Sequence, residues 1–189
     1  MVENNPEFRF LDKIKYIFTD PDFFFEKVKE EKGILNSFLF YLLLLVFFSV
    51  LGTFSYLLLA NLAGSDLLFL GFLSTGALFF GMVGSIAISF IYAGLVFLFA
   101  WLFKGKGSYV DTYNVYAYSM TPYVMGSVIP FLGTLLLIYF LILATIGISK
   151  VHDLSKGKAF AAVFLPAFIV MGALILFFII LLALLFRGF

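Results

Sequence analysis

The chain has 189 residues, of which 63% are hydrophobic, 21% are aromatic and only 12% are charged. Soluble domains carry about 25% charged residues, so this composition predicts an integral membrane protein. The net charge of +1 offers no strong field for nucleic acid, and the lack of cysteine excludes disulfides, thiolate metal sites and cysteine nucleophiles.

The first 33 residues are charged throughout and contain no cleavable signal peptide. Apolar side chains recur at helical spacing on both sides of Asp20-Pro21, a pair typical of an N-cap and a first helical position. We predict two short amphipathic helices on the cytoplasmic membrane surface. Their apolar residues either anchor the first span or dock a partner, and the candidate interfacial anchor is Phe10, Ile14, Phe18, Phe24 and Val28.

Five apolar stretches follow, and the predicted spans cover about residues 34–62, 76–103, 109–129, 131–149 and 159–186. The run from Leu67 to Phe103 would form ~55 Å of helix, which is too long for a ~30 Å hydrocarbon core. We expect it to break at Gly71 to Ala77, with residues 67–75 forming an interfacial or re-entrant piece. The predicted domains are a cytoplasmic segment, residues 1–33, and a five-helix transmembrane domain, residues 34–189.

Lysine and arginine predict the orientation, because they favour the cytoplasmic side of a membrane. Eleven of the twelve lie in the N-terminal segment or in the loops after the second and fourth spans. Five spans place all eleven on one side, with only Arg187 opposite. The predicted fold is therefore an all-α polytopic bundle with a cytoplasmic N-terminus and an external C-terminus. It would lie in the plasma membrane if the source is prokaryotic.

The second span carries small residues four apart, a pattern that lets helix backbones approach closely. This candidate helix-packing stripe serves either the packing of the bundle or a homodimer face. Its members are Ala77, Gly81, Ser85, Ser89 and Ala93.

The third span is unusually polar. Pro122 removes a backbone hydrogen bond to the carbonyl of Tyr118, which a hydroxyl from Ser119 or Thr121, or a water, can replace. The cluster is either a kinked, buried helix that satisfies itself or a cytoplasm-facing cavity or partner site. The candidate residues are Asp111, Tyr113, Asn114, Tyr116, Tyr118, Ser119, Thr121 and Pro122.

Catalytic patterns are missing from the sequence. Its one histidine, His152, lies in a predicted loop, and neither a metal-binding motif nor a phosphate-binding glycine loop occurs. The middle of each span lacks ionisable residues, which argues against a proton or charged-substrate carrier. We therefore expect the protein to have no enzymatic activity and no cofactor. A passive pore or a lipid-handling groove is still compatible with the sequence.

Three segments resemble the Yip family of Ypt/Rab-GTPase-interacting membrane proteins, and in particular its compact archaeal and bacterial members. They are "FTDPDFFFEKVKEEKG", "YNVYAYSMTPY" and "ISKVHDLSKGKAFAAVFLP", and the resemblance covers about residues 15 to 185. It implies five spans and a cytoplasmic N-terminus. Eukaryotic relatives are linked to Rab GTPases and vesicle traffic, but this chain lacks their long N-terminal domain and a "DLYGP"-type motif.

The sequence thus predicts a non-enzymatic membrane scaffold or adaptor that binds a protein partner or organises the membrane. The expected partners are the lipid bilayer, a protein at the cytoplasmic face or a homo- or hetero-oligomer, and no nucleic acid. The alternative is a passive conduit for ions or small solutes, or a lipid-binding or lipid-moving protein with a polar cavity beside the third span.

Overall fold

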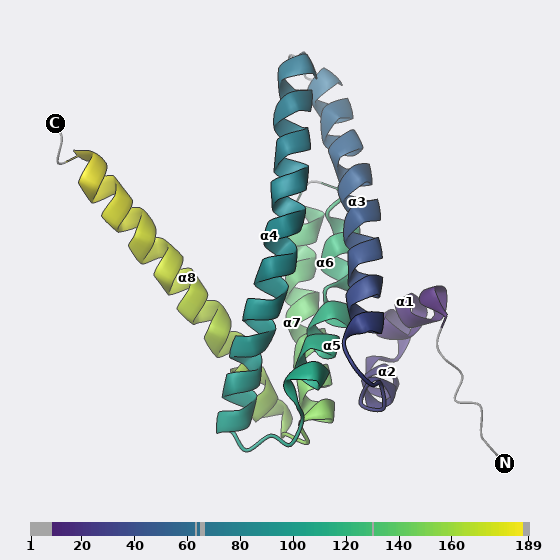
Figure 1. Ribbon diagram of the computed structural model, residues 1–189. Coiled ribbons are helices and arrows are strands. Elements are labelled where there is room, and N and C mark those ends of the chain that lie inside the picture. The colour runs from purple at the N-terminus through teal and green to yellow at the C-terminus, as the bar shows by residue number, and fades with distance from the viewer. Residues whose placement is uncertain (1–8, 63, 65–66, 130, 187–189) are drawn as a thin grey trace.

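The computed structural model describes residues 9–62, 64, 67–129 and 131–186, with only the backbone described for residues 67–79 and parts of the last helix. Every element in the described part is helical, which confirms the predicted all-α class. Figure 1 shows an upright bundle, with α1 and α2 against one end and α8 leaning away. The helices are α1 (Phe10–Thr19), α2 (Pro21–Val28), α3 (Leu35–Leu62), α4 (Leu67–Leu102), α5 (Tyr109–Ser119), α6 (Thr121–Gly126), α7 (Leu132–Val151) and α8 (Lys156–Phe186).

Within the described residues, three helical stretches are long and apolar enough to cross a membrane: α3, Phe80–Leu102 of α4, and α7. The break that the sequence predicts at Gly71 to Ala77 is wrong, because α4 is one continuous helix from residue 67 to residue 102. Each glycine, serine or threonine costs a helix about 1 kcal/mol or less, whereas a backbone group left unpaired in lipid costs several kcal/mol. The helix therefore continues, and its 36 residues correspond to ~54 Å.

The predicted third span is divided into α5 and α6 at Met120. Met120 keeps a helical backbone (φ −68°, ψ −10°), so α6 continues in the general direction of α5 (Figure 1). Pro122 lies in the first turn of α6, where its missing N–H costs least. The Thr121 hydroxyl donates to the Tyr118 carbonyl at 2.7 Å, which confirms that a nearby hydroxyl replaces the lost backbone bond.

The two N-terminal helices form as predicted, and Asp20 caps α2 by accepting a hydrogen bond from the Phe23 N–H at 3.1 Å. They do more than rest on a surface. The α1 helix crosses the bundle from α3, where the Phe10 ring lies 4.9 Å from that of Phe40, to α7, where the Phe18 ring lies 5.9 Å from that of Tyr139.

Of the candidate anchor residues, Phe24 and Val28 are buried inside the protein, Ile14 is partly buried, and Phe10 and Phe18 are exposed. Phe24 and Val28 belong to the same buried cluster as residues of α5 and α7. The N-terminal helices and the bundle therefore share one core.

Helices of this core approach each other closely at a glycine. A Cβ at Gly147 would lie 2.5 Å from a Val115 methyl and 3.0 Å from the Phe25 ring, so α7, α5 and α2 meet at this position. The small-residue stripe of α4 is buried at Ser89 and Ala93, whereas Gly81 is exposed with open space beside it. Ser85 is partly buried, and the side chain of Ala77 lies outside the described ones.

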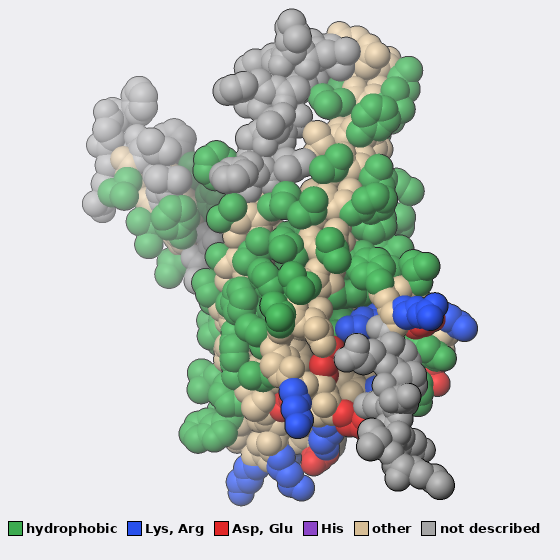
Figure 2. Space-filling view, turned by 45° about the vertical axis from the view of Figure 1, so that its right-hand side comes forward, with side chains coloured by type: hydrophobic (Ala, Val, Ile, Leu, Met, Phe, Trp, Pro, Cys, Tyr) green, Lys and Arg blue, Asp and Glu red, His purple; other side chains and the backbone are tan. Residues whose placement is uncertain are grey.

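The N-terminal helices, the α4–α5 loop and the α7–α8 loop lie at one end of the molecule (Figure 1). Lysine and arginine side chains gather at that end, together with acidic ones, and hydrophobic side chains are prominent above it (Figure 2). We call it the basic end. Arg187, which the sequence places on the opposite side, lies outside the described residues.

Candidate functional site

The polar residues of α5 begin with a helix cap. The Asp111 carboxylate accepts hydrogen bonds from the backbone N–H and the hydroxyl of Ser108, at 2.7 and 2.8 Å. In return, the Ser108 hydroxyl accepts from the Asp111 N–H, which completes a capping box. Asp111 therefore has a structural role as the cap of α5.

The next residues of α5 face the interior of the bundle. Asn114 is fully buried and donates to the Gly33 carbonyl at 3.1 Å, while its amide oxygen lies 2.6 Å from the Ser37 hydroxyl. These contacts join α5 to the beginning of α3. Tyr113 stacks on Phe90 of α4, with ring centroids 4.6 Å apart, and Tyr116 is enclosed by other aromatic rings: Tyr41, Tyr92 and Phe140.

Ser119 and Pro122 are buried at the junction of α5 and α6. The Ser119 hydroxyl has no hydrogen-bond partner among the described residues. No group of three metal-ligating side chains occurs in the described part of the chain either.

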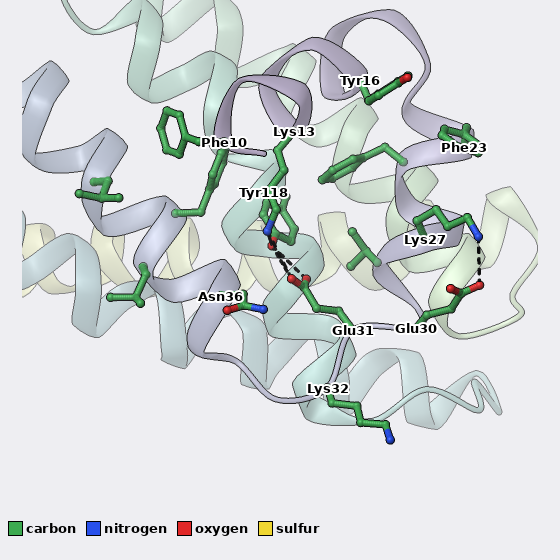
Figure 3. Close-up of a pocket in the computed structure, with 15 residues that line it drawn as sticks. Phe10, Lys13, Tyr16, Phe23, Lys27, Glu30, Glu31, Lys32, Asn36 and Tyr118 are labelled. Atoms are coloured by element: carbon green, nitrogen blue, oxygen red, sulfur yellow. Dashed lines mark hydrogen bonds and ion pairs between the residues drawn. The ribbon is translucent and has the colours of Figure 1, made fainter. Parts of the chain in front are cut away.

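Tyr118 is the residue of α5 that connects the bundle to the N-terminal helices. Its hydroxyl accepts a hydrogen bond from the Lys13 ammonium at 2.6 Å and donates to the Glu31 carboxylate, whose two oxygens both lie 2.9 Å away. Lys13 and Glu31 also pair with each other at 3.3 Å, with side chains only 15% and 17% exposed. Figure 3 shows the three groups converging from α1, the segment before α3, and α5. We call them the Lys13–Glu31–Tyr118 cluster.

Aromatic rings surround the buried ammonium of this cluster. The Lys13 nitrogen lies 4.8 Å from the centre of the Tyr118 ring and 5.9 Å from that of Phe40. Both distances are in the range in which a ring face attracts a cation. The Phe24 ring meets the Tyr118 ring edge-on, with centroids 5.1 Å apart, so α2 also packs against Tyr118. The cluster therefore holds α1 and α2 against α5 by charge, hydrogen bonds and ring contacts together.

A cavity of about 690 Å³ opens beside the cluster, between the N-terminal helices and the first part of α3. Figure 3 shows Lys13, Glu31 and Tyr118 meeting at its centre. Its lining mixes charged and apolar side chains, and within the lining α5 contributes Tyr118 alone. Such a chamber can hold a molecule that has both a polar and an apolar part.

His152 forms a second buried polar site at the basic end. Its Nε2 lies 2.7 Å from the Thr112 hydroxyl, which donates its own hydrogen to the Ser108 carbonyl at 3.0 Å. When the Thr112 hydroxyl donates to that carbonyl, its oxygen accepts from a protonated Nε2 and Nδ1 is the bare nitrogen. A Cβ at Gly105 would lie 2.8 Å from Nδ1, so the α4–α5 loop covers the ring closely. Burial lowers the pKa of His152 below its ordinary value, although Asp111 and Asp153 oppose this shift.

Ion pairs join three separate segments at the basic end. Lys29 of the segment after α2 lies 2.7 Å from the Asp153 carboxylate in the α7–α8 loop, and Lys106 of the α4–α5 loop lies 3.8 Å from it. The pKa of the Asp153 carboxyl is held below its usual range mainly by Lys29. Lys150 of α7 approaches Asp22 and Glu26 of α2 at 3.5 and 3.6 Å. We call this surface the charged platform.

The sequence identified Tyr118 as a candidate but gave no reason to join it to Lys13 or Glu31, which lie 105 and 87 residues away along the chain. It also left His152 in an open loop, whereas the structure buries it completely. A histidine between lysine-rich loops carries no local signal of burial.

A family model described as the Yip1 domain matches residues 15–186 of this chain. The match covers the second half of α1, the whole of α2 to α7, and α8 to its last residue. No curated protein and no solved structure matches the chain.

Proposed function

Because the chain belongs to the Yip family of integral membrane proteins, we propose that it is a non-enzymatic scaffold or adaptor that docks a protein partner on its charged platform. The observation that carries this proposal is the platform itself. Side chains from α2, the α4–α5 loop and the α7–α8 loop are joined by ion pairs and still remain largely open to solvent. A surface of that kind, assembled from separate segments, offers complementary charge to a soluble partner.

We further propose that the chain crosses the membrane five times, through α3, α4, α5 with α6, α7 and α8. The α5–α6 pair covers residues 109–126, or ~27 Å at the helical rise, which is close to the thickness of a hydrocarbon core. The gathering of basic side chains at one end supports a cytoplasmic location for that end. The N-terminus would then be cytoplasmic and the C-terminus external.

Single cysteines test this topology directly, because the chain has no cysteine of its own. Lys106→Cys lies at the basic end and Asn61→Cys at the far end of α3. A membrane-impermeant maleimide should label Asn61→Cys from outside intact cells and Lys106→Cys only after the membrane is opened. Labelling of both positions from the same side would overturn the proposed topology.

The conduit alternative receives less support from the geometry. Most polar side chains of α5 contact the backbone, other elements or neighbouring rings, and Tyr118 is the α5 residue that lines the cavity. The cavity lies between the N-terminal helices and α3 and not along the third span. This position favours a lipid-binding site over a path for solutes.

Deleting residues 1–33 would be a poor test of partner docking, because α1 and α2 contribute to the shared core. Point changes on the platform are better. Glu26→Lys combined with Lys106→Glu keeps the net charge and alters two exposed side chains. Asn61→Lys, at the opposite end, is the control.

The tagged full-length protein would be crosslinked in its own membrane, purified, and its partners quantified. We expect the control to retain its crosslinked partners and the platform variant to lose them. If the platform variant retrieves the same partners in the same amounts as the control, the platform is not the docking site.

A further inference from the structure

The cavity beside the Lys13–Glu31–Tyr118 cluster is lined by two chemical kinds of side chain. Lys27, Lys32 and Asn36 contribute charged and amide groups. Phe10, Leu39, Phe40 and Leu43 contribute an apolar wall. At about 690 Å³ the cavity falls within the range of ligand sites, which is roughly 300–1,000 Å³.

The apolar wall continues into the surface that α3 offers to lipid. Leu39 and Leu43 are 44% and 59% exposed although they line the cavity. Val46, Phe47 and Val50 extend the same helical face toward the other end of α3, and all three are exposed. Because α3 is long and apolar enough to span a membrane, these exposed lining residues would face the bilayer.

Two of the three lysines among the described lining residues have carboxylate partners. Lys13 pairs with Glu31, and Lys27 pairs with Glu30 at 3.4 Å. Among the described residues, Lys32 has an exposed ammonium without an ion-pair partner. Asn36 also lines the cavity (Figure 3). An exposed ammonium without an ion-pair partner at a membrane surface favours a phosphate group.

We propose that this cavity binds one phospholipid from the leaflet at the basic end. Its phosphate would lie against Lys32, and the upper part of an acyl chain would lie along Phe10, Leu39 and Leu43. The platform and this cavity use different side chains, so the lipid site does not depend on the adaptor proposal, and each can fail without the other.

The test uses the full-length protein in nanodiscs of phosphatidylcholine that contain a small fraction of phosphatidylglycerol with a photoactivatable acyl chain. After illumination, labelled peptides are mapped and quantified by mass spectrometry. We expect label to concentrate on the peptides that contain Phe10 and Leu39 to Leu43. Leu43→Trp should fill the apolar side and remove most of this label, whereas Val50→Trp, farther along the same face, should not.

Lys32→Gln tests the phosphate contact with an exposed residue, so folding is not at risk. Loss of a charge-assisted contact worth ~1.4 kcal/mol corresponds to a decrease in affinity of about tenfold, and Lys156→Gln at the same end is the matched control. Label spread evenly along α3 and unaffected by Leu43→Trp would show only the ordinary lipid annulus and would overturn the proposal. Loss of the label with excess inorganic phosphate would assign the site to free phosphate, and an unchanged Lys32→Gln variant would remove the headgroup assignment.

Discussion

Replacing Tyr118 with phenylalanine tests whether the Lys13–Glu31–Tyr118 cluster holds the N-terminal helices in place. The change removes a hydroxyl that lies 2.6 Å from the ammonium and 2.9 Å from both carboxylate oxygens, and it keeps the ring that packs on Phe24 and Phe40. Hydrogen bonds to charged groups contribute roughly 1.5–3 kcal/mol. Lys13 and Glu31 retain each other as partners, so we expect a loss of about 1–2 kcal/mol in the free energy of unfolding.

Lys13→Met extends this prediction to a double-mutant cycle. The substitution removes the ammonium and keeps most of the apolar stem, which leaves Glu31 with the Tyr118 hydroxyl alone. Since the two residues are in direct contact, the effects of Lys13→Met and Tyr118→Phe should not add, and their coupling energy should be about 0.5–3 kcal/mol.

The assay is equilibrium unfolding in mixed micelles, followed by helical ellipticity, with hydrogen exchange of the α1 amides as a local readout. Tyr56→Phe is the control, because Tyr56 is exposed on α3. We expect faster exchange in α1 for Tyr118→Phe but not for Tyr56→Phe. If Tyr118→Phe is as neutral as the control and adds independently to Lys13→Met, the cluster does not hold the N-terminal helices.

Three other substitutions test separate contacts. Gly147→Ala should lower stability by about 1–3 kcal/mol in thermal unfolding, because its Cβ has no space, whereas Gly81→Ala should be neutral; equal effects would refute the close packing. Thr121→Val should cost about 0.5–1.5 kcal/mol by leaving the Tyr118 carbonyl unpaired, while Thr121→Ser should retain most stability; identical melting of the two variants would contradict that bond. The pKa of His152 is lowered by burial, so the unfolded chain takes up the proton first as pH falls. Stability should therefore decrease as pH falls below about 6.5, and His152→Gln should weaken this dependence; an unchanged pH profile would refute it.

Local patterns in the sequence were sufficient for much of the fold. Three predictions depend on neighbouring residues, and the structure confirms them: the helical class, the cap at Asp20-Pro21, and the hydroxyl that bonds the carbonyl left unpaired by Pro122. The continuity of α4 was not predictable in the same way. Gly, Ser and Thr are breaking signals in water, but the cost of unpaired backbone groups in lipid reverses the balance.

The candidate site was only partly accessible to sequence reasoning. Tyr118 was a candidate because it belongs to the polar residues around Pro122 in the predicted third span. The partners themselves, Lys13 and Glu31, lie on charged segments where most lysines and glutamates are solvated, so their burial depends on how α1 folds across α5. The cavity follows from the same docking, since it forms between α1, α2 and α3.

Crosslinking between α1 and α7 tests most directly whether the N-terminal helices are part of the membrane bundle. Cysteines at Phe18 and Tyr139, whose rings lie 5.9 Å apart, should be joined by a short bis-maleimide in native membranes. In the control pair, the cysteines are at Leu11 and Tyr139. Leu11 is exposed near the other end of α1, so this pair should not be joined. Efficient crosslinking of the first pair alone is the predicted result. Failure of that pair, or equal crosslinking of both, would show that α1 does not dock across the bundle as described.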